Sequence, residues 1–123
     1  MNSGMRRIVL GCAAGLVLAA STWSTAAAAI KVGAIFAVTG PASFLGGPEA
    51  RSAEMAVARI NREGGINGEQ VELIVKDSAG SPEKAVSFAK QLIEEERVVA
   101  IIGPSTSGES MAVKKIAEDG RTV

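Results

Sequence analysis

The stretch VVAIIGPSTSGES, residues 98–110, places five apolar residues directly before a turn rich in glycine and hydroxyl side chains. A short apolar run of this kind is typical of a strand buried in a parallel sheet. The segment MAVKKIAEDG follows, and we expect a helix over residues 107–119, closed by Gly120. The turn therefore joins a strand to a helix, and such a junction often holds a negatively charged group.

Two further strand-and-helix pairs precede this one. The predicted strands cover residues 30–38 and 70–76, and the predicted helices cover residues 48–63 and 82–95. The first strand is apolar on both faces, as a strand covered by helices above and below should be, whereas the second alternates and is placed nearer an edge. Ser81, Pro82 and Glu83 give the second of these helices an N-cap, a proline at the first helical position and an acid in the first turn.

Strands that alternate with helices predict a parallel, doubly wound, Rossmann-like α/β sheet with helices on both faces. In such sheets, ligands bind at the carboxyl ends of the strands, where the chain reverses direction across the sheet. For the strand order 2-1-3, the loops over residues 39–47 and 103–107 should meet at this point. Asp77, at the end of the second strand, is expected to fix a loop or to line the edge of the cleft. Residues 121–123 resemble the start of a fourth strand, so we expect the chain to be the N-terminal piece of a longer protein.

Residues 1–29 have the pattern of a secretory signal peptide. Arg6 and Arg7 form a basic start, an uncharged run of 13 residues follows, and the segment ends in four alanines. The uncharged run is shorter than the roughly 20 residues that a membrane span needs. We therefore expect cleavage near Ala29 and a periplasmic location. Lipoprotein anchoring through Cys12 is not favoured, because cleavage there would leave almost no apolar core before the cysteine.

The composition of residues 30–123 excludes several classes of function. Two of the 13 basic residues, Arg6 and Arg7, precede this segment, which leaves 11 basic against 13 acidic residues and a net charge of −2. Such a segment lacks the excess of positive charge that attracts nucleic acid, so no nucleic-acid partner is expected. It also contains no His, Cys, Tyr or Trp. A metal site built on His or Cys is therefore excluded, and stacking platforms for bases are not expected.

Nucleotide binding and catalysis fit the turn poorly. Gly103 and Gly108 have the spacing of a G-x-x-x-x-G-K-[ST] loop, but Glu109 stands where the lysine should be and would repel phosphates. The loop after the first strand lacks the G-x-G-x-x-G of dinucleotide-binding folds. A G-x-S-x-G nucleophile elbow is also absent, because its last glycine is replaced by Ser107. With no His to act as a base, the segment carries no enzymatic chemistry of its own.

A bound carboxylate fits the turn better. Thr106 and Glu109 have the spacing of a capping box, which leaves the first N–H groups of the helix facing the cleft. A carboxylate at this helix end gains about 0.3–1 kcal/mol, and up to ~2 kcal/mol when partly buried. The hydroxyls of Ser105 or Ser107 could add hydrogen bonds to the ligand, or they could only cap the helix and stabilise the turn.

Three segments resemble the branched-chain amino acid type of periplasmic binding protein, the solute receptors of ABC importers. They are TGP (39–41), INREGGING (60–68) and GPSTSG (103–108), in this order and spacing. The resemblance covers residues 30–123, under half of a typical member. It implies the N-terminal part of the first lobe of a two-lobed type I periplasmic binding protein that closes on its ligand. It further implies a non-enzymatic receptor without a cofactor, a small-molecule ligand (an amino acid, an amide or a small carboxylate), and the membrane permease of an ABC transporter as partner.

The resemblance also implies site residues. By position, Ser107 matches a serine that contacts the amino acid, and Ser105 and Thr106 match neighbours that line the pocket. Leu45 matches a position that is often aromatic and touches the ligand side chain, and Phe44 lies beside it. From the residues alone, Phe44 and Leu45 could pack on the core or touch a ligand. A leucine departs from the usual pattern, so the side-chain specificity stays open.

Two other interpretations remain open at this point. A periplasmic ligand-sensing domain of a signalling system could use the same lobes, and it would need a transmembrane or coupling segment downstream. A secreted α/β enzyme would need catalytic residues beyond Val123. Both depend on sequence other than residues 1–123.

Overall fold

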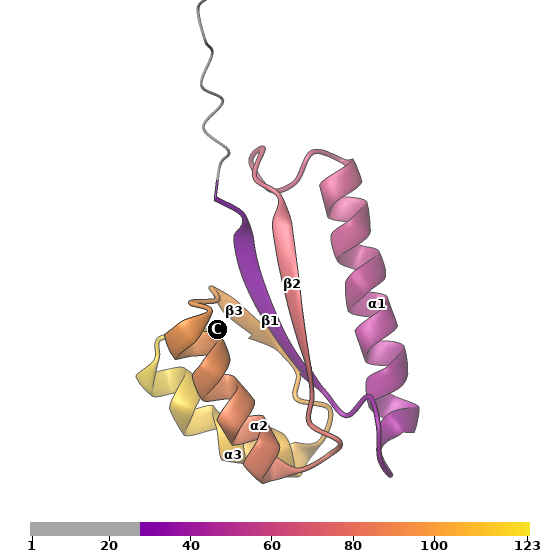
Figure 1. Ribbon diagram of the computed structural model, residues 1–123, viewed down its shortest axis with the longest axis vertical. Coiled ribbons are helices and arrows are strands. Elements are labelled where there is room, and N and C mark those ends of the chain that lie inside the picture. Colours follow the sequence, from indigo (N-terminus) through magenta and orange to yellow (C-terminus); the bar gives the residue numbers. More distant parts are fainter. Residues whose placement is uncertain (1–27) are drawn as a thin grey trace, which may run out of the picture.

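The computed structural model describes residues 28–123, in which strands and helices alternate along the chain (Figure 1). The strands are β1 (Ile30–Phe36), β2 (Val71–Asp77) and β3 (Ala100–Ile102), and the helices are α1 (Ser43–Arg62), α2 (Pro82–Lys90) and α3 (Ser107–Asp119). A π-helical turn, η1 (Gln91–Glu95), continues α2. Residues 1–27 of the predicted signal peptide, which include Cys12, lie outside the described residues. None of the helices in the described part is both long enough and apolar enough to cross a membrane.

The three strands form a parallel sheet in the order β2-β1-β3. β1 pairs with β2 along its whole length, from Ile30 opposite Val71 to Phe36 opposite Asp77. On its other side β1 pairs with β3, where Gly33 lies opposite Ile101. The predicted parallel α/β sheet with the order 2-1-3 is confirmed, and within residues 28–123 β2 pairs with β1 alone. Because all three strands run the same way, their carboxyl ends meet at one edge.

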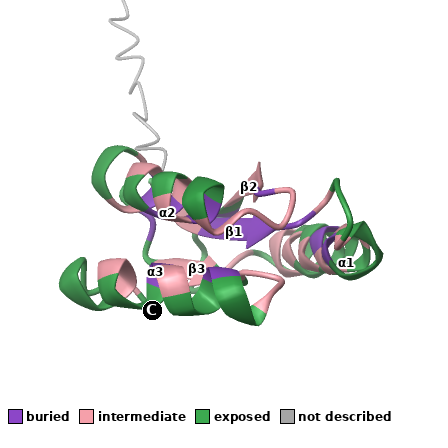
Figure 2. Cartoon of the chain, turned by 90° about the horizontal axis from the view of Figure 1, so that it is seen from below, coloured by how far each residue is buried: buried purple, intermediate pink, exposed green. Residues whose placement is uncertain are grey.

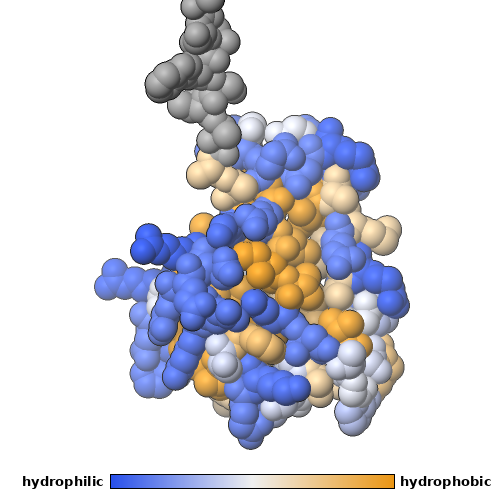
Figure 3. All heavy atoms as spheres, viewed as in Figure 1, coloured by the Kyte–Doolittle hydropathy of each residue, from blue (hydrophilic) through white to orange (hydrophobic). Residues whose placement is uncertain are grey.

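The core lies in two layers, one on each face of the sheet. Along β1 the side chains alternate: Ile35 packs with α2 and α3, whereas Ala34 and Phe36 pack with Ala50 of α1. Figure 1 shows α1 on one side of the sheet and α2 and α3 on the other, and Figure 2 shows β1 buried between them. β1 is apolar on both faces for this reason. Figure 3 shows hydrophobic residues gathered where Figure 1 draws β1 and β2, flanked by hydrophilic residues.

The start of α1 differs from the prediction. The helix begins at Ser43, five residues before the expected Pro48, so Phe44 and Leu45 lie in its first turn rather than in a loop. Proline is favoured in the first turn because it lacks an N–H, and this preference made Pro48 resemble a helix start. Instead, the N–H groups of Leu45 and Gly46 already donate to Ala42 O, at 2.9 and 3.2 Å, and Pro48 is accommodated inside the helix.

The ends of two strands also differ from the prediction. β1 ends at Phe36 rather than at residue 38, because the N–H of Ala37 donates to the hydroxyl of Ser105 instead of to a neighbouring strand. β3 begins at Ala100 rather than at residue 98, because the N–H of Val98 donates to Leu92 O and remains tied to η1. The predicted second helix is confirmed over residues 82–90, and residues 91–95 continue it with π-helical bonds.

Candidate ligand-binding site

The connections after β1 and β3 meet at the carboxyl edge of the sheet, as predicted. Gly46 of α1 is buried so closely against β1 that a Cβ at this position would stand 2.5 Å from Ala37 N. From the other side, Gly103 has a φ of +99°, and a Cβ there would overlap the carbonyl oxygen of Ile35. Glycine is needed at both positions because the backbones approach without room for a side chain. The first turn of α1 and the turn before α3 therefore flank the end of β1.

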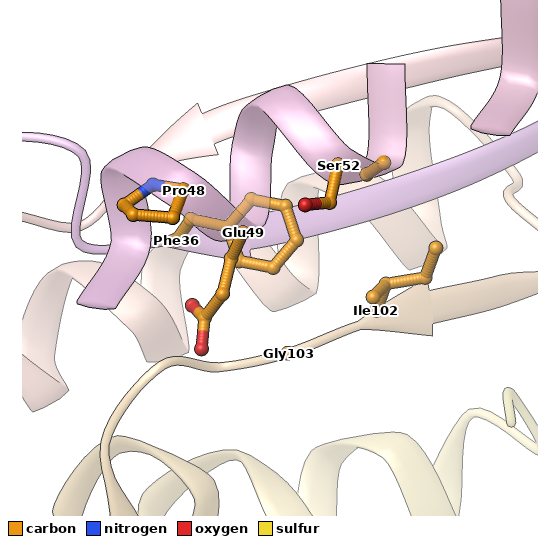
Figure 4. A pocket seen from close by; sticks show the side chains of 7 residues that line it. Phe36, Pro48, Glu49, Ser52, Ile102 and Gly103 are labelled. Carbon is orange, nitrogen blue, oxygen red and sulfur yellow. The ribbon is translucent and has the colours of Figure 1, made fainter. Parts of the chain in front are cut away.

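The hydroxyl of Ser105 joins these two connections. Its Oγ accepts a hydrogen bond from Ala37 N at 3.0 Å and donates one to the carboxylate of Glu49 on α1. Figure 4 shows the Glu49 carboxylate reaching from α1 toward the segment at Gly103. Ser105 is half-buried, and its hydroxyl both accepts and donates a hydrogen bond within the protein. Ser105 therefore bridges α1, the residue that follows β1, and the turn before α3.

Thr106 caps α3 with Glu109, as the spacing predicted. The Thr106 hydroxyl accepts from Glu109 N at 3.4 Å and donates to Glu109 Oε2 at 2.7 Å, while Thr106 N donates to the same oxygen at 3.2 Å. The capping box is confirmed. Glu109 is fully buried, and its second oxygen, Oε1, has no hydrogen-bond partner among residues 28–123.

Ser107, the first residue of α3, differs from its neighbours because it is exposed. Its hydroxyl makes no hydrogen bond within the described part of the chain, whereas that of Ser110 donates to Thr106 O at 3.0 Å. The N–H groups of Ser107 and Gly108 begin the helix, so they have no acceptor one turn earlier. This helix start thus offers one hydroxyl and two N–H groups to a molecule at the edge of the sheet. The partial positive charge of the helix end favours an anion there.

Phe44 and Leu45 lie in the first turn of α1, at the same edge of the sheet. The Phe44 side chain is 73% exposed and that of Leu45 is 40% exposed. Neither is packed into the two core layers. Of the two alternatives left open by the sequence, packing on the core is therefore not what the structure shows.

Asp77 fixes the loop after β1, one of the two roles that the sequence predicted for it. Its carboxylate accepts from Thr39 Oγ1 at 2.6 Å and from Thr39 N at 3.1 Å. It also accepts from Ala79 N at 3.0 Å, within the turn after β2. The hydrogen bond from the Thr39 hydroxyl is the main cause that lowers the pKa of Asp77, and backbone N–H donors add to it. The ends of β1 and β2 are thereby tied together beside the candidate site.

A cavity of about 450 Å³ lies on the α1 side of the sheet, next to this edge (Figure 4). Its lining residues are Phe36, Pro48, Glu49, Ser52, Ala53, Ile102 and Gly103. None of the five residues predicted for the site from sequence belongs to this lining. Glu49 was missed because a single acid in an amphipathic helix carries no local signal of its partner. In residues 28–123, no three His, Cys, Asp or Glu side chains are grouped to hold a metal ion.

Comparisons with known proteins place this fold in a family. Residues 29–123 match the family model of the periplasmic binding proteins. The Leu/Ile/Val-binding protein homolog 7 of Brucella abortus is 37% identical over 93 residues, which are 76% of this chain and 23% of that protein.

Solved structures give the same result. The branched-chain amino acid transporter substrate binding protein LivJ of Streptococcus pneumoniae, in complex with isoleucine, aligns with a TM-score of 0.76 at 34% identity over 77% of this chain and 27% of LivJ. An ABC transporter substrate-binding protein from Sphaerobacter thermophilus aligns with a TM-score of 0.69 at 34% identity, over 77% of this chain and 25% of that one. The chain thus spans about a quarter of the length of the proteins that it matches. It belongs to the periplasmic binding protein family, of the branched-chain amino acid type.

Proposed function

We propose that this chain forms part of the extracytoplasmic solute receptor of an ABC importer. The receptor binds an amino acid, or a similar small carboxylate or amide, and delivers it unchanged to a membrane permease. The observation that carries the proposal is the start of α3. There Ser107 is exposed and its hydroxyl makes no hydrogen bond within residues 28–123, whereas the hydroxyls of Ser105 and Thr106 are hydrogen-bonded within the protein. The names of the aligned relatives, which include transporter substrate-binding proteins, support the same function.

The ligand carboxylate is assigned to the start of α3. Glu109 occupies the inner side of this helix start, so the carboxylate takes the outer groups: the Ser107 hydroxyl and the N–H groups of Ser107 and Gly108. The helix end contributes about 0.3–1 kcal/mol to a carboxylate, and up to ~2 kcal/mol when the site is partly buried. A carboxamide has an oxygen acceptor but no charge, so it should bind there less tightly.

The ligand side chain is assigned to the first turn of α1. Phe44 and Leu45 present exposed apolar surface at the same edge of the sheet. Apolar side chains favour an apolar ligand group, because its transfer from water is favourable. The isoleucine bound in the aligned LivJ structure and the name of the Brucella relative point to branched aliphatic amino acids as the first ligands to test.

The proposal includes the organisation of the whole receptor. Residues 1–29 are a signal peptide removed on export to the periplasm, and residues 30–123 are the N-terminal part of the first ligand-binding lobe. The remainder of that lobe, the hinge and the second lobe lie in a longer chain, which the quarter-length match to the relatives supports. Closure of the two lobes is driven by tighter binding of the ligand to the closed state.

The test is a calorimetric titration of the complete mature protein. Leucine, isoleucine and valine are compared with their carboxamides and with polar amino acids. Replacing Ser107 by alanine should weaken the binding of the tightest-binding amino acid by roughly 1–3 kcal/mol, because the buried carboxylate of the ligand loses a hydrogen bond. Ser110→Ala is the matched control: it removes a hydroxyl from the same helix that is already bonded to Thr106 O, and the affinity should stay unchanged.

Two results would contradict the proposal at different levels. A folded protein that shows no saturable binding of any amino acid, amide or small carboxylate would overturn the receptor function. Saturable binding with an unchanged affinity in Ser107→Ala would keep the function and remove Ser107 from the site.

A further inference from the structure

Glu49 connects α1 to the turn before α3. It lies in the second turn of the helix, is half-buried, and its Oε2 accepts the hydrogen bond of the Ser105 hydroxyl. Ser105 Oγ in turn accepts from Ala37 N at 3.0 Å. One carboxylate, one hydroxyl and one backbone N–H thus link three segments that are far apart in the sequence. Figure 4 shows the Glu49 side chain crossing the space between α1 and the chain at Gly103.

This link acts on the residues next to Ser107. Ser105 is held by Glu49 on one side, and the following residue, Thr106, is held by Glu109 on the other. Two consecutive residues are therefore fixed by carboxylates from two different helices. Ser107 follows directly, so its position and that of the first N–H groups of α3 depend on both carboxylates.

Glu49 also lies one helical turn from Leu45, at the apolar end of the proposed site. Leu45 precedes Glu49 by four residues in α1, and residues at this spacing lie on one face of a helix, one turn apart. The Glu49–Ser105 hydrogen bond therefore helps to hold α1, which carries Leu45, against the turn that leads into Ser107. In the proposed site, these two segments carry the groups that contact the ligand side chain and those that hold its carboxylate.

We propose that Glu49 is a positioning residue of the ligand site, which acts through the hydroxyl of Ser105. This proposal rests on the proposed function, because it assigns Glu49 a role in placing the groups that hold the ligand. Glu49 acts as a hydrogen-bond acceptor rather than as a charge. Its negative charge by itself would repel a ligand carboxylate, and a charge effect would therefore have the opposite sign.

The experiment measures the affinity of the complete protein for isoleucine, by calorimetry, in five variants alongside the wild type. Glu49→Ala and Ser105→Ala each break the link, and the double variant removes both partners. Glu49→Gln keeps an oxygen that accepts from the Ser105 hydroxyl but removes the charge. Glu54→Ala is the matched control, since Glu54 is an exposed acid of the same helix. Urea unfolding of each variant reports stability separately from affinity.

We expect Glu49→Ala and Ser105→Ala each to weaken the binding of isoleucine by up to about tenfold, which is the upper end of what one ordinary hydrogen bond contributes. The double variant should bind isoleucine no more weakly than either single variant does, because both changes remove the same link. Glu49→Gln should stay within about threefold of the wild type, and Glu54→Ala should equal it. The ratio of the affinities for isoleucine and its carboxamide should fall in Glu49→Ala, which a loss of stability alone would not cause.

Several results would overturn the proposal. Glu49→Ala with wild-type affinity would show that the link does not position the site, even if Ser107→Ala loses binding and the receptor function stands. Additive losses in the double variant, or tighter binding in Glu49→Gln, would show that Glu49 acts by another route. If Glu49→Ala does not fold, Ser105→Ala tests the link from its other end, and an unchanged affinity there would overturn the proposal. A wild-type protein that binds no amino acid would remove the proposed function and this inference together.

Discussion

Replacing Gly46 by alanine tests whether α1 lies directly against the end of β1. Gly46 is buried inside the helix, and an added Cβ would stand 2.5 Å from Ala37 N and still nearer to the carbonyl group of that residue. Ordinary van der Waals contacts of a Cβ begin at 3.4 Å. The obstacle is the backbone that follows the central strand, so neither a rotamer change nor a flexible side chain can relieve the overlap.

The expected magnitude follows from two opposing effects. Alanine in place of glycine stabilises a helix interior by about 1 kcal/mol. Forcing an extra methyl group into a packed core costs typically ~1–3 kcal/mol, and the upper part of this range applies where a backbone must move. Gly46→Ala should therefore lower the free energy of unfolding by about 1–2 kcal/mol. Gly47 is the matched control: its added Cβ would meet only Arg51 Nη1, at 3.8 Å, and Gly47→Ala should raise the free energy of unfolding by up to ~1 kcal/mol.

The assay is urea unfolding of the complete protein carrying each change. Two neighbouring glycines of one helix should then respond with opposite signs, a difference of roughly 2–3 kcal/mol. Gly46→Ala should also weaken the binding of the ligand, because displacement of Ala37 disturbs the hydrogen bond from Ala37 N to Ser105. Equal stabilisation by both substitutions would refute the close packing of α1 on β1, and with it the early start of that helix.

Three further predictions concern single contacts. The pKa of Asp77 is lowered mainly by the Thr39 hydroxyl, so its contribution to stability is present above the ordinary carboxyl pKa of about 3.9 and is lost as the pH falls through its lower folded-state pKa. Thr39→Val should raise that pKa toward the ordinary value in an NMR titration, and an unchanged value would contradict the assignment. Thr106→Ala removes the cap of α3 and should cost ~0.5–2 kcal/mol of unfolding free energy, whereas no loss in urea unfolding would show that the capping box contributes nothing. N-terminal sequencing of the exported protein should begin near Ile30, and a retained N-terminus would refute cleavage near Ala29.

The fold could be predicted because its signals are local. The apolar segment from Ile30 to Phe36, the N-cap at Ser81 and the spacing of Thr106 and Glu109 each depend on residues near one another in the chain, and each is present in the structure. The start of α1 could not be predicted in this way. Pro48 gave a strong local signal for a helix start, but the helix begins five residues earlier, where Gly46 packs closely on Ala37.

In the candidate site too, the features with local signals could be predicted and those that depend on distant residues could not. The hydroxyl-rich turn was found from its own sequence, and the capping box within it was confirmed. Which of the three hydroxyls is hydrogen-bonded within the protein was not predictable, because Ser105 donates to Glu49, which lies 56 residues earlier in the chain. An isolated acid on a helix does not indicate its distant partner. Ser107 remains the residue whose role depends on a ligand, and its contact with the ligand stays a prediction.

The most direct test of the central claim is a crystal structure of the complete protein with isoleucine bound. We expect the ligand carboxylate at the start of α3, with an oxygen about 2.7–3.2 Å from Ser107 Oγ or from the first backbone nitrogens of the helix. We expect the ligand side chain beside Leu45. A carboxylate held elsewhere, with Ser107 free of the ligand, would contradict the claim that this helix start is the binding site.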